Sequence, residues 1–479
     1  MNPPQVSVII PAFNQCAYLG AAVQSVLDQT FTDWELVVVD DGSTDNTSEV
    51  AARFSDPRIH VMRQVNKGLP GARNTGIAAS SGEYLAFLDA DDTYLPNKLE
   101  IQVAHLDKEP GVGLSYASRI EIDQQDQPSW LVRAPEQTDL RRLVLGFPFT
   151  INDLLVRRTW VERVGGFDET FRLHSEDRDF YLRLALAGCR FESDDHFLAY
   201  RRLHARRTFD RIPERIATMQ RALMTAFGDP RCPADVLALQ GPAMAQIFLI
   251  WGCQELVQGE VEAGRAHLRE AARLDPGLFG NEAGGRSSSF VRFVVHSSVR
   301  DRSDHVPPVV SIFDGLPPEL AKTFAPHKEW ALARGYLIRG ALEVLWGRLP
   351  EGQALLALAV EGRGRLDPYL MSILIDQLSS YELEFGPAKA HKVLGDLLAS
   401  LSGVGTPAQV RWLAGYYSLN QAFIDYHRGC YADVLRGVVR AARADPTRMA
   451  NMGVLSIFTR SLFGLAGRKG SALLRLRRA

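Results

Sequence analysis

The first 125 residues alternate four short apolar runs with segments of helical pattern, and this alternation restricts the fold more than any other feature. The apolar runs predict buried strands, because strands of parallel sheets are apolar on both faces. We therefore expect an α/β fold whose mostly parallel sheet is covered by helices on both faces. The predicted strands are Val6–Phe13, Trp34–Asp41, Ile59–Gln64 and Tyr84–Asp91, and the predicted helices are Ala17–Gln29, Asp45–Phe54, Gly71–Ser80 and Pro96–Lys108.

Acidic residues follow two of the predicted strands. Asp40 and Asp41 end the second strand, and the run Asp89–Asp92 ends the fourth. Ligands of open α/β sheets bind beyond the carboxyl ends of the strands, so both groups are candidates for a ligand site. Asp41 could accept hydrogen bonds from a nucleobase or a ribose. The alternative is that Asp-Gly-Ser-Thr provides only turn and helix-cap chemistry.

The second acidic group offers the ligands of a hard cation. Asp89 and Asp91 are one residue apart, and their oxygens could approach one Mg²⁺ or Mn²⁺ ion that also takes diphosphate oxygens. Asp92 places a third acid in the same four residues, and the mutual repulsion of these acids favours a nearby cation. The alternative is a charged turn that caps the next segment.

The second half of the chain is predicted to be helical. We expect a boundary between residues 1–225 and a helical domain of residues 226–479, with a long loop at about 280–318 rich in Gly, Ser and Pro. Segments 259–276 and 429–446 both begin with Gly and reach Asp-Pro 16 residues later, and 347–368 is similar with four extra residues. This pattern resembles degenerate tetratricopeptide repeats. The alternative is an ordinary helical bundle in which Asp-Pro ends helices.

The overall charge hides an asymmetry. The chain has 54 basic and 56 acidic residues, but residues 446–479 contain seven basic residues and no acidic one. An apolar stripe followed by arginines could lie on an anionic membrane surface, or it could be a last helix with a solvated end. The acidic remainder excludes a nucleic-acid partner, and the 46% hydrophobic content excludes a disordered chain.

The five cysteines are scattered without a C-x-x-C pair, which argues against a disulfide framework or a cysteine zinc site. The first residues lack the pattern of a signal peptide, and no uncharged apolar run reaches the roughly 18 residues that span a bilayer. We therefore expect a cytoplasmic protein, peripheral at the inner face of the membrane if the tail binds lipid.

Four segments in order resemble the family 2 glycosyltransferases: VSVIIPAFN (6–14), LVVVDDGSTD (36–45), NKGLPGARNTGI (66–77) and GEYLAFLDADD (82–92). The resemblance covers roughly residues 5–210 and implies the GT-A fold. It implies an inverting transfer (EC 2.4) from a nucleotide-diphospho-sugar, with a UDP-sugar favoured, to a hydroxyl of a glycan, lipid-linked or protein acceptor. It also implies Mn²⁺ or Mg²⁺ as the cofactor.

The resemblance assigns roles to individual positions. Asp41 matches the carboxylate that reads the base, and Asp89 and Asp91 match the DXD pair. His204 matches the C-terminal histidine that completes the metal shell, with His196 as a competitor. The residues implied to bind the nucleotide-sugar are Pro11, Phe13, Asn14, Asp41, Asn66, Lys67, Gly68, Arg73, Asn74, Asp89 and Ala90.

The resemblance also supplies a catalytic base. Glu176 and Asp177 precede a predicted helix and match the family's xED motif, in which Asp177 is the base. An acceptor hydroxyl must lose its proton as it attacks, and a positioned carboxylate can take it. The alternative is that both acids simply favour a helix N-terminus. The nearby basic run, Arg201, Arg202, Arg206 and Arg207, could contact a diphosphate or an anionic acceptor, or it could form a solvated face.

Two further classes of protein compete with this interpretation. A sugar-1-phosphate nucleotidyltransferase shares the fold, but the Gly-rich loop that it needs after the first strand is absent here. A transferase-like scaffold whose helical domain binds partners is the alternative of a different class, and the intact Asp89, Asp91 and Asp177 argue against it. The chain has no Q-x-x-R-W motif, so we expect a single addition rather than processive synthesis.

Overall fold

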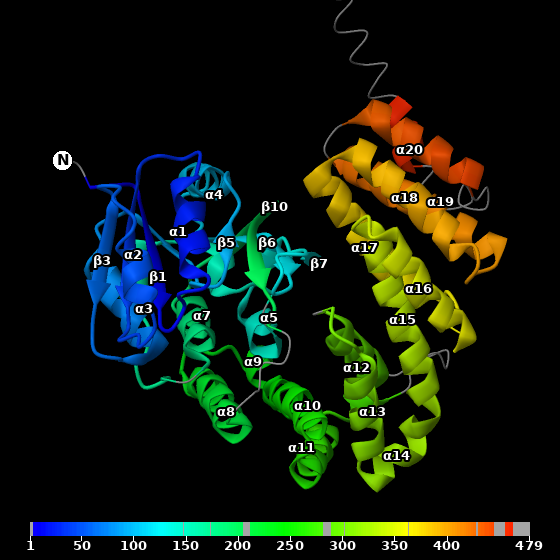
Figure 1. Cartoon of the computed structure of the whole chain (residues 1–479), viewed down its shortest axis with the longest axis horizontal. Helices are drawn as coiled ribbons and strands as arrows, with labels where there is room; N and C mark the ends of the chain where they lie inside the picture. Colours follow the sequence, from blue (N-terminus) through cyan, green and yellow to red (C-terminus); the bar gives the residue numbers. More distant parts are fainter. Residues whose placement is uncertain are drawn as a thin grey trace, which may run out of the picture. The chain divides into compact units, whose positions relative to one another are not determined.

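The chain divides into two compact units, Met1–Lys328 and Glu329–Ala479 (Figure 1). The computed structural model describes residues 3–146, 148–172, 174–204, 211–280, 289–300, 302–362, 364–427, 430–444 and 456–462. The predicted boundary at 225/226 does not coincide with this division, because several helices after residue 225 belong to the same unit as the sheet. It therefore stays a prediction about the extent of the family domain. Most of the basic tail lies outside the described residues.

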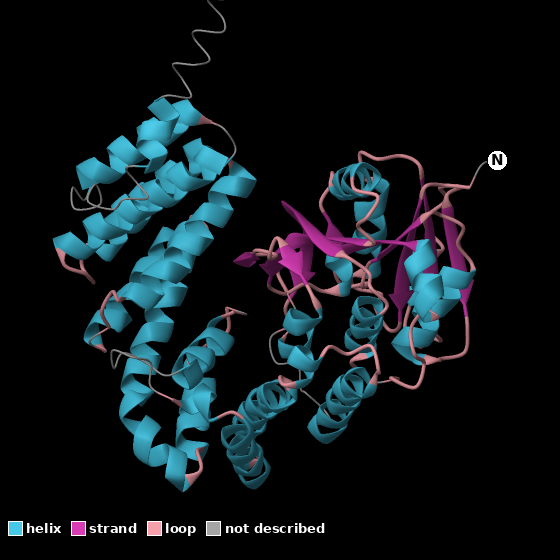
Figure 2. Ribbon diagram, turned by 180° about the vertical axis from the view of Figure 1, so that it is seen from behind, coloured by secondary structure: helices cyan, strands magenta, loops and turns pink. Residues whose placement is uncertain are grey.

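A mixed sheet, whose strands are magenta in Figure 2, forms the centre of the first unit. Its ten strands lie in the order β3-β2-β1-β4-β9-β6-β10-β5, with β7 beside β6 and β8 beside β10. Strands β3, β2, β1 and β4 are parallel, and β9 runs antiparallel between β4 and β6. The predicted α/β class is confirmed. The strands are β1 Val6–Ala12, β2 Trp34–Asp40, β3 Ile59–Arg63, β4 Tyr84–Phe87, β5 Thr93–Tyr94, β6 Leu114–Ile122, β7 Pro128–Val132, β8 Gln137–Thr138, β9 Leu154–Arg157 and β10 Phe191–Arg202.

Both faces of this sheet are buried. Along β1, Val8 and Ile10 belong to one core cluster and Ile9 to another, because successive side chains of a strand point to opposite faces. The first cluster includes residues of α1 and α4, and the second includes residues of α7 and α8. The helices at these faces are α1 Leu19–Leu27, α2 Thr47–Ala51, α3 Gly68–Ala78, α4 Lys98–Lys108, α5 Leu140–Leu145, α6 Arg158–Val164, α7 Glu176–Leu186 and α8 Ile212–Gly228.

The prediction of a long loop at about 280–318 is wrong for most of the residues that the structure describes there. Helix α12, Ser289–Val299, and helix α13, Val306–Gly315, lie within it, and residues 281–288 lie outside the described residues. Proline breaks helices in their interior, but Pro307 and Pro308 stand in the first turn of α13, where no intrahelical donor is lost. The neighbouring elements are α9 Ala234–Leu237, α10 Gln240–Gln258, α11 Val261–Leu274, η2 Pro276–Phe279, α14 Pro318–Phe324 and η3 Ala325–His327.

One helical stretch in the described part of the chain, Ala234–Gln258, is long and apolar enough to cross a membrane, which corrects the expectation that none exists. Half of its apolar window is buried inside the structure. Among its buried side chains, Ile247 and Trp251 belong to the core cluster that also covers the sheet. A helix that is apolar on all sides also suits the core of a large unit, so length and composition alone do not distinguish the two environments.

The second unit consists of helices in the described residues: α15 Lys328–Leu345, α16 Leu349–Glu361, α17 Pro368–Phe385, α18 Pro387–Leu401, α19 Pro407–His427 and α20 Tyr431–Ala444. Helices α15 and α16 touch through their backbones, since a Cβ on Gly352 would lie 2.8 Å from the carbonyl oxygen of Gly340. In the first unit, Gly264 of α11 approaches Gly252 of α10 in the same way. Close approach of two helices at a glycine also occurs in ordinary helical bundles, so it does not test the predicted relation between segments 259–276 and 347–368. Their membership of the tetratricopeptide family stays a prediction.

Candidate active site

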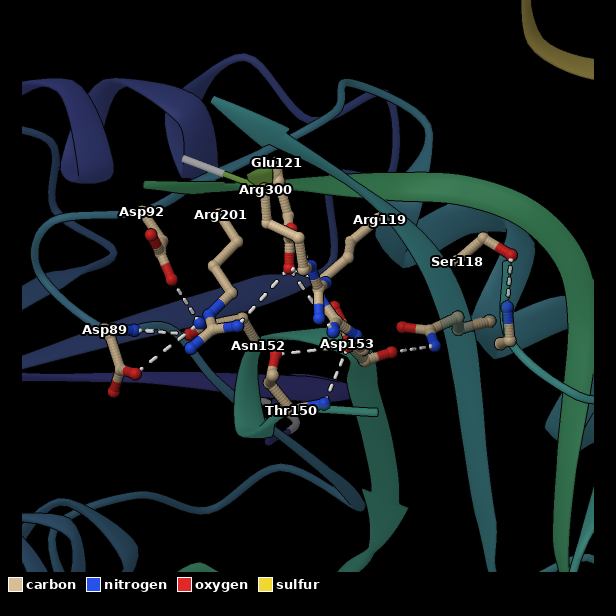
Figure 3. Close-up of polar contacts among 12 residues, drawn as sticks. Asp89, Asp92, Ser118, Arg119, Glu121, Thr150, Asn152, Asp153, Arg201 and Arg300 are labelled. Atoms are coloured by element: carbon tan, nitrogen blue, oxygen red, sulfur yellow. Dashed lines mark hydrogen bonds and ion pairs between the residues drawn. The ribbon is translucent and has the colours of Figure 1, made fainter. Parts of the chain in front are cut away.

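Asn152 forms hydrogen bonds with the acidic turn that follows β4 (Figure 3). The backbone N–H of Asp89 donates to Asn152 Oδ1 at 2.6 Å, and the Asn152 side-chain amide donates to Asp92. Asn152 is 1% exposed and lies in the 3₁₀ turn η1, Ile151–Asp153. No sequence signal singled out Asn152, because its partners lie about 60 residues earlier in the chain.

Arg73 connects this turn to the predicted catalytic helix. Its guanidinium donates to Asp89 Oδ1 at 2.8 Å through Nη2 and to Glu176 Oε1 at 2.6 Å through Nη1. The side chain is 2% exposed. Burial opposes the charge, but Asp89 and Glu176 raise the pKa of Arg73 above its usual value. The resemblance assigned Arg73 to the nucleotide-sugar, whereas its observed contacts are with the two acidic motifs.

The predicted base lies in the first turn of α7. Ser175, just before the helix, has a left-handed backbone with φ of 73°, and the chain turns sharply there. Asp177 Oδ1 accepts a hydrogen bond from the N–H of Arg178 at 2.7 Å. Burial raises the pKa of Glu176 to about 7, and burial also raises the pKa of Asp177. These two carboxyl groups therefore hold protons more tightly than exposed ones.

His204 lies against the DXD pair. Its Nε2 atom is 2.7 Å from Asp91 Oδ2, and its ring stands edge-on to Tyr18. The competitor His196 is 55% exposed and lies beside Asp194 instead. Neighbouring Arg202 is buried and donates to the Asp91 carbonyl oxygen, so it supports the turn. Arg206 and Arg207 of the basic run lie outside the described residues.

The donor set suits a divalent cation in part. Asp91 and His204 bring a carboxylate oxygen and an imidazole nitrogen together, and both bind Mn²⁺ readily. Asp89 faces Arg73 through one oxygen. Among the described residues, no three His, Cys, Asp or Glu side chains are gathered closely enough to hold a metal ion.

Asp41 organises the loop between β3 and α3. One of its oxygens accepts from the N–H of Lys67 and the other from the N–H of Gly68, each at 2.9 Å. Gln64 also donates to it at 2.7 Å, and Asp41 is 2% exposed. The carboxylate expected to read a base therefore already holds the backbone at the start of α3. Gln64 is a further residue that sequence reasoning missed.

The other predicted nucleotide-sugar residues lie in or after β1, after β4, and in the segment that runs from the end of β3 into α3. Phe13, Asn14, Asn66 and Lys67 are exposed there. Asn74 is engaged elsewhere, since its amide donates to the carbonyl oxygen of Phe167 at 2.8 Å and fixes the segment before the catalytic helix. Pro11 is buried within β1, Ala90 is buried in the acidic turn, and Gly68 begins α3.

Comparison with known proteins agrees with this geometry. Residues 7–165 match the family model described as Glycosyl transferase family 2. Residues 7–165 therefore form a glycosyltransferase family 2 domain, and the mixed sheet and the acidic turn that follows β4 agree with this match.

Individual relatives match shorter stretches. The UDP-Glc:alpha-D-GlcNAc-diphosphoundecaprenol beta-1,3-glucosyltransferase WfgD of Escherichia coli is 45% identical over 105 residues, which are 22% of this chain and 42% of that relative. The uncharacterized glycosyltransferase alr2836 of Nostoc sp. is 35% identical over 213 residues, 42% of this chain and 65% of that relative. The chain thus spans less than two thirds of the length of either relative.

A solved structure shows a weaker likeness. S. aureus TarS 1–349 aligns over 67% of this chain and 91% of that chain, with 17% sequence identity and a TM-score of 0.46. A likeness of this size supports no argument about activity.

Proposed function

We propose that this protein is an inverting glycosyltransferase that moves a sugar from a nucleotide-diphospho-sugar to an acceptor hydroxyl. One observation carries the proposal: Arg73 joins Asp89 of the acidic turn to Glu176, the residue next to the predicted base. The acidic turn, which would bind the donor, and the helix start that carries the predicted base are thus joined by the buried guanidinium group of Arg73. A UDP-sugar is the favoured donor, and the name of WfgD, which contains UDP-Glc, supports this choice.

In the proposed reaction, the acceptor oxygen attacks C1 of the sugar from the face opposite the diphosphate. The new bond between that oxygen and C1 forms as the bond between C1 and the phosphate oxygen breaks, and the electron pair leaves with the nucleoside diphosphate. Asp177 takes the proton of the acceptor hydroxyl. The raised pKa of Asp177 suits this role, because it brings the carboxylate's basicity closer to neutral pH.

Asp91 and His204 would hold a divalent cation, Mn²⁺ or Mg²⁺, with Asp89 nearby. When bound, such an ion would neutralise negative charge that grows on the departing diphosphate. The chain's own part is to keep these donors in place. Asn152 accepts a hydrogen bond from the N–H of Asp89, and Arg202 donates to the carbonyl oxygen of Asp91, and these two bonds to the backbone of the turn support this role.

We propose a single addition to a cell-surface glycan or glycoconjugate. The absence of a Q-x-x-R-W motif from the sequence supports non-processive transfer. The name of WfgD describes a lipid-diphosphate-linked acceptor for that relative. An acceptor of this class also suits a basic tail that contacts a membrane.

A screen of nucleotide-sugars tests the proposal. The full chain is incubated with each candidate donor and Mn²⁺, and the release of nucleoside diphosphate is measured with and without acceptor extracts. We expect release with one donor, faster when an acceptor is present. A chain that binds and turns over no nucleotide-sugar would support the transferase-like scaffold instead.

A further inference from the structure

Glu121, a fully buried carboxylate in β6, is surrounded by three arginines from separate segments (Figure 3). Arg300, directly after α12, donates from Nε to Glu121 Oε2 at 3.0 Å and from Nη2 to Oε1. Arg201 of β10 approaches Oε1 with its Nη1 at 3.5 Å, and Arg119 of β6 approaches the same oxygen at 3.7 Å. Arg300 therefore occupies both oxygens of Glu121, and Arg201 makes only a longer contact.

The three arginines differ in their other partners. Arg119 has a second partner, Asp153, whose Oδ2 lies 3.0 Å from Arg119 Nη1. Arg201 also faces the charges of Asp89 and Asp92, the acids of the turn that follows β4. A buried carboxylate needs a close cationic partner, since an unpaired one costs several kcal/mol. Glu121 will accordingly recruit another arginine if Arg300 is absent.

Arg201 is the arginine that stands between Glu121 and the active site. Figure 3 shows its guanidinium beside the acidic turn that contains Asp89 and Asp92. Its strand, β10, leads directly to His204, which contacts the DXD pair. The side chain keeps 28% of its surface exposed, whereas Arg119 keeps 6%. Arg201 is therefore placed to reach a ligand of the acidic turn, and Arg119 is not.

We propose that Arg201 contacts the diphosphate of the donor and that Arg300 is a positioning residue that keeps Arg201 available for it. Arg300 does so by satisfying both oxygens of Glu121, the carboxylate that would otherwise draw Arg201 away. A guanidinium has five N–H donors in a fixed plane, which suits two phosphate oxygens well. The proposal rests on the proposed function, because it assumes a nucleotide-diphospho-sugar as donor.

This proposal gives the helical segment a part in the chemistry. Both Arg201 and Arg300 lie beyond residues 7–165, the stretch that matches the family model. A residue that follows α12 thereby controls a side chain at the edge of the sheet, without touching the donor itself.

The test compares the affinities of the full chain for UDP and for UMP by isothermal titration calorimetry, always with the same concentration of Mn²⁺. The dissociation constant of UMP divided by that of UDP reports how much affinity the second phosphate adds. In Arg300→Ala we expect this ratio to fall about tenfold, the size of one hydrogen bond between charged groups. Arg300→Lys keeps one cationic contact with Glu121 and should recover part of the ratio.

The decisive variant is the double change Glu121→Gln with Arg300→Ala. Removing the carboxylate releases Arg201, so the double variant should regain the ratio that Arg300→Ala loses. If the role of Arg300 is merely structural, the double variant should have a ratio no higher than that of Arg300→Ala, because the second change would disturb the structure further. Arg133→Ala, which removes an exposed ion pair with Asp195, is the matched control and should keep the wild-type ratio.

Each outcome decides one question. An unchanged ratio in Arg300→Ala, or a double variant no better than Arg300→Ala, would overturn the positioning role. If Glu121→Gln prevents folding, as seen by circular dichroism, Arg300→Lys still tests the proposal by its partial recovery. A wild-type chain that binds neither UDP nor any other nucleoside diphosphate refutes the proposed function instead, and the two failures are thus distinguishable.

Discussion

His204 Nε2 lies 2.7 Å from Asp91 Oδ2, although the two residues are 113 positions apart in the chain. The contact exists because β10 carries His204 past the acidic turn that follows β4. An imidazole and a carboxylate in this arrangement are either a hydrogen-bonded pair or two ligands that share a cation.

The first prediction concerns these two residues and the cation. Treatment with EDTA should abolish transfer, and Mn²⁺ should restore it. In His204→Ala, the Mn²⁺ concentration for half-maximal activity should rise at least about tenfold, since loss of even an outer partner of a metal ligand costs about 10–100-fold in affinity. His196→Ala is the control, because His196 lies beside Asp194 and should leave the Mn²⁺ titration unchanged. Full activity in EDTA would contradict the metal assignment.

The second prediction concerns the base. Asp177→Asn keeps the size of the side chain but cannot take a proton, so transfer should fall by about 10²–10⁴-fold. Binding of UDP should change little, because Asp177 is not among the residues assigned to the nucleotide. Initial rates and calorimetric titration measure the two quantities separately. Normal turnover in this variant would show that another group removes the acceptor's proton.

The third prediction is the pH dependence. Burial raises the pKa of Asp177, so kcat/KM should decline with falling pH at a higher pH than an exposed aspartate would give, and burial also raises the pKa of the neighbouring Glu176 to about 7. In Glu176→Gln the neighbouring charge is absent and Arg73 can lower the pKa of Asp177 further, which should move this decline to lower pH. An unmoved profile would mean that Glu176 does not influence the titrating group.

The raised pKa of Glu176 also affects the stability of the fold: activity should rise with pH, whereas the contribution of Glu176 to stability should fall with pH. A carboxyl group whose pKa is raised in the folded state loses stability when it ionises. The contribution of Glu176 should therefore be most favourable below about pH 4.5 and least favourable above about pH 7. Thermal unfolding of the wild type and of Glu176→Gln at pH 5 and pH 8 measures this difference.

The fourth prediction concerns the second unit. A Cβ on Gly352 would lie 2.6 Å from Val344 Cγ2, so Gly352→Ala should push α15 and α16 apart and destabilise the unit by about 1–3 kcal/mol. Gly395→Ala, on the exposed side of α18, is the matched control. No atom within 4 Å would meet its Cβ, and the change should stabilise the helix by up to about 1 kcal/mol. Urea unfolding of both variants gives the comparison.

The sequence predicted strands β1 to β4 and the acidic turn, but not β5 to β10, because long apolar runs and the acids that end them are local features that only the first four strands carry. The meeting of Asp91 and His204 was inferred from the family resemblance and not from any local pattern. The role of Arg73 could not be predicted, since one of its partners, Glu176, lies 103 positions away. Helix α13 was missed because its prolines indicated a loop, although they stand where a helix tolerates them.

Residues 446–455 and 463–479 of the basic tail lie outside the described residues, so its contact with a membrane stays a prediction. Binding of the full chain to vesicles with and without anionic lipid tests it. Binding that is independent of lipid charge would favour a solvated end.

The ion pair between Arg300 and Glu121 also bears on how this protein can be shortened or recombined. A fragment trimmed to the family match would keep Glu121 and Arg119 but lose Arg201 and Arg300, and Arg300 is the arginine that binds both oxygens of Glu121. The smallest functional transferase should therefore extend at least through Arg300. Chimeric enzymes that exchange helical parts between relatives would have to transfer this arginine together with the strand it serves.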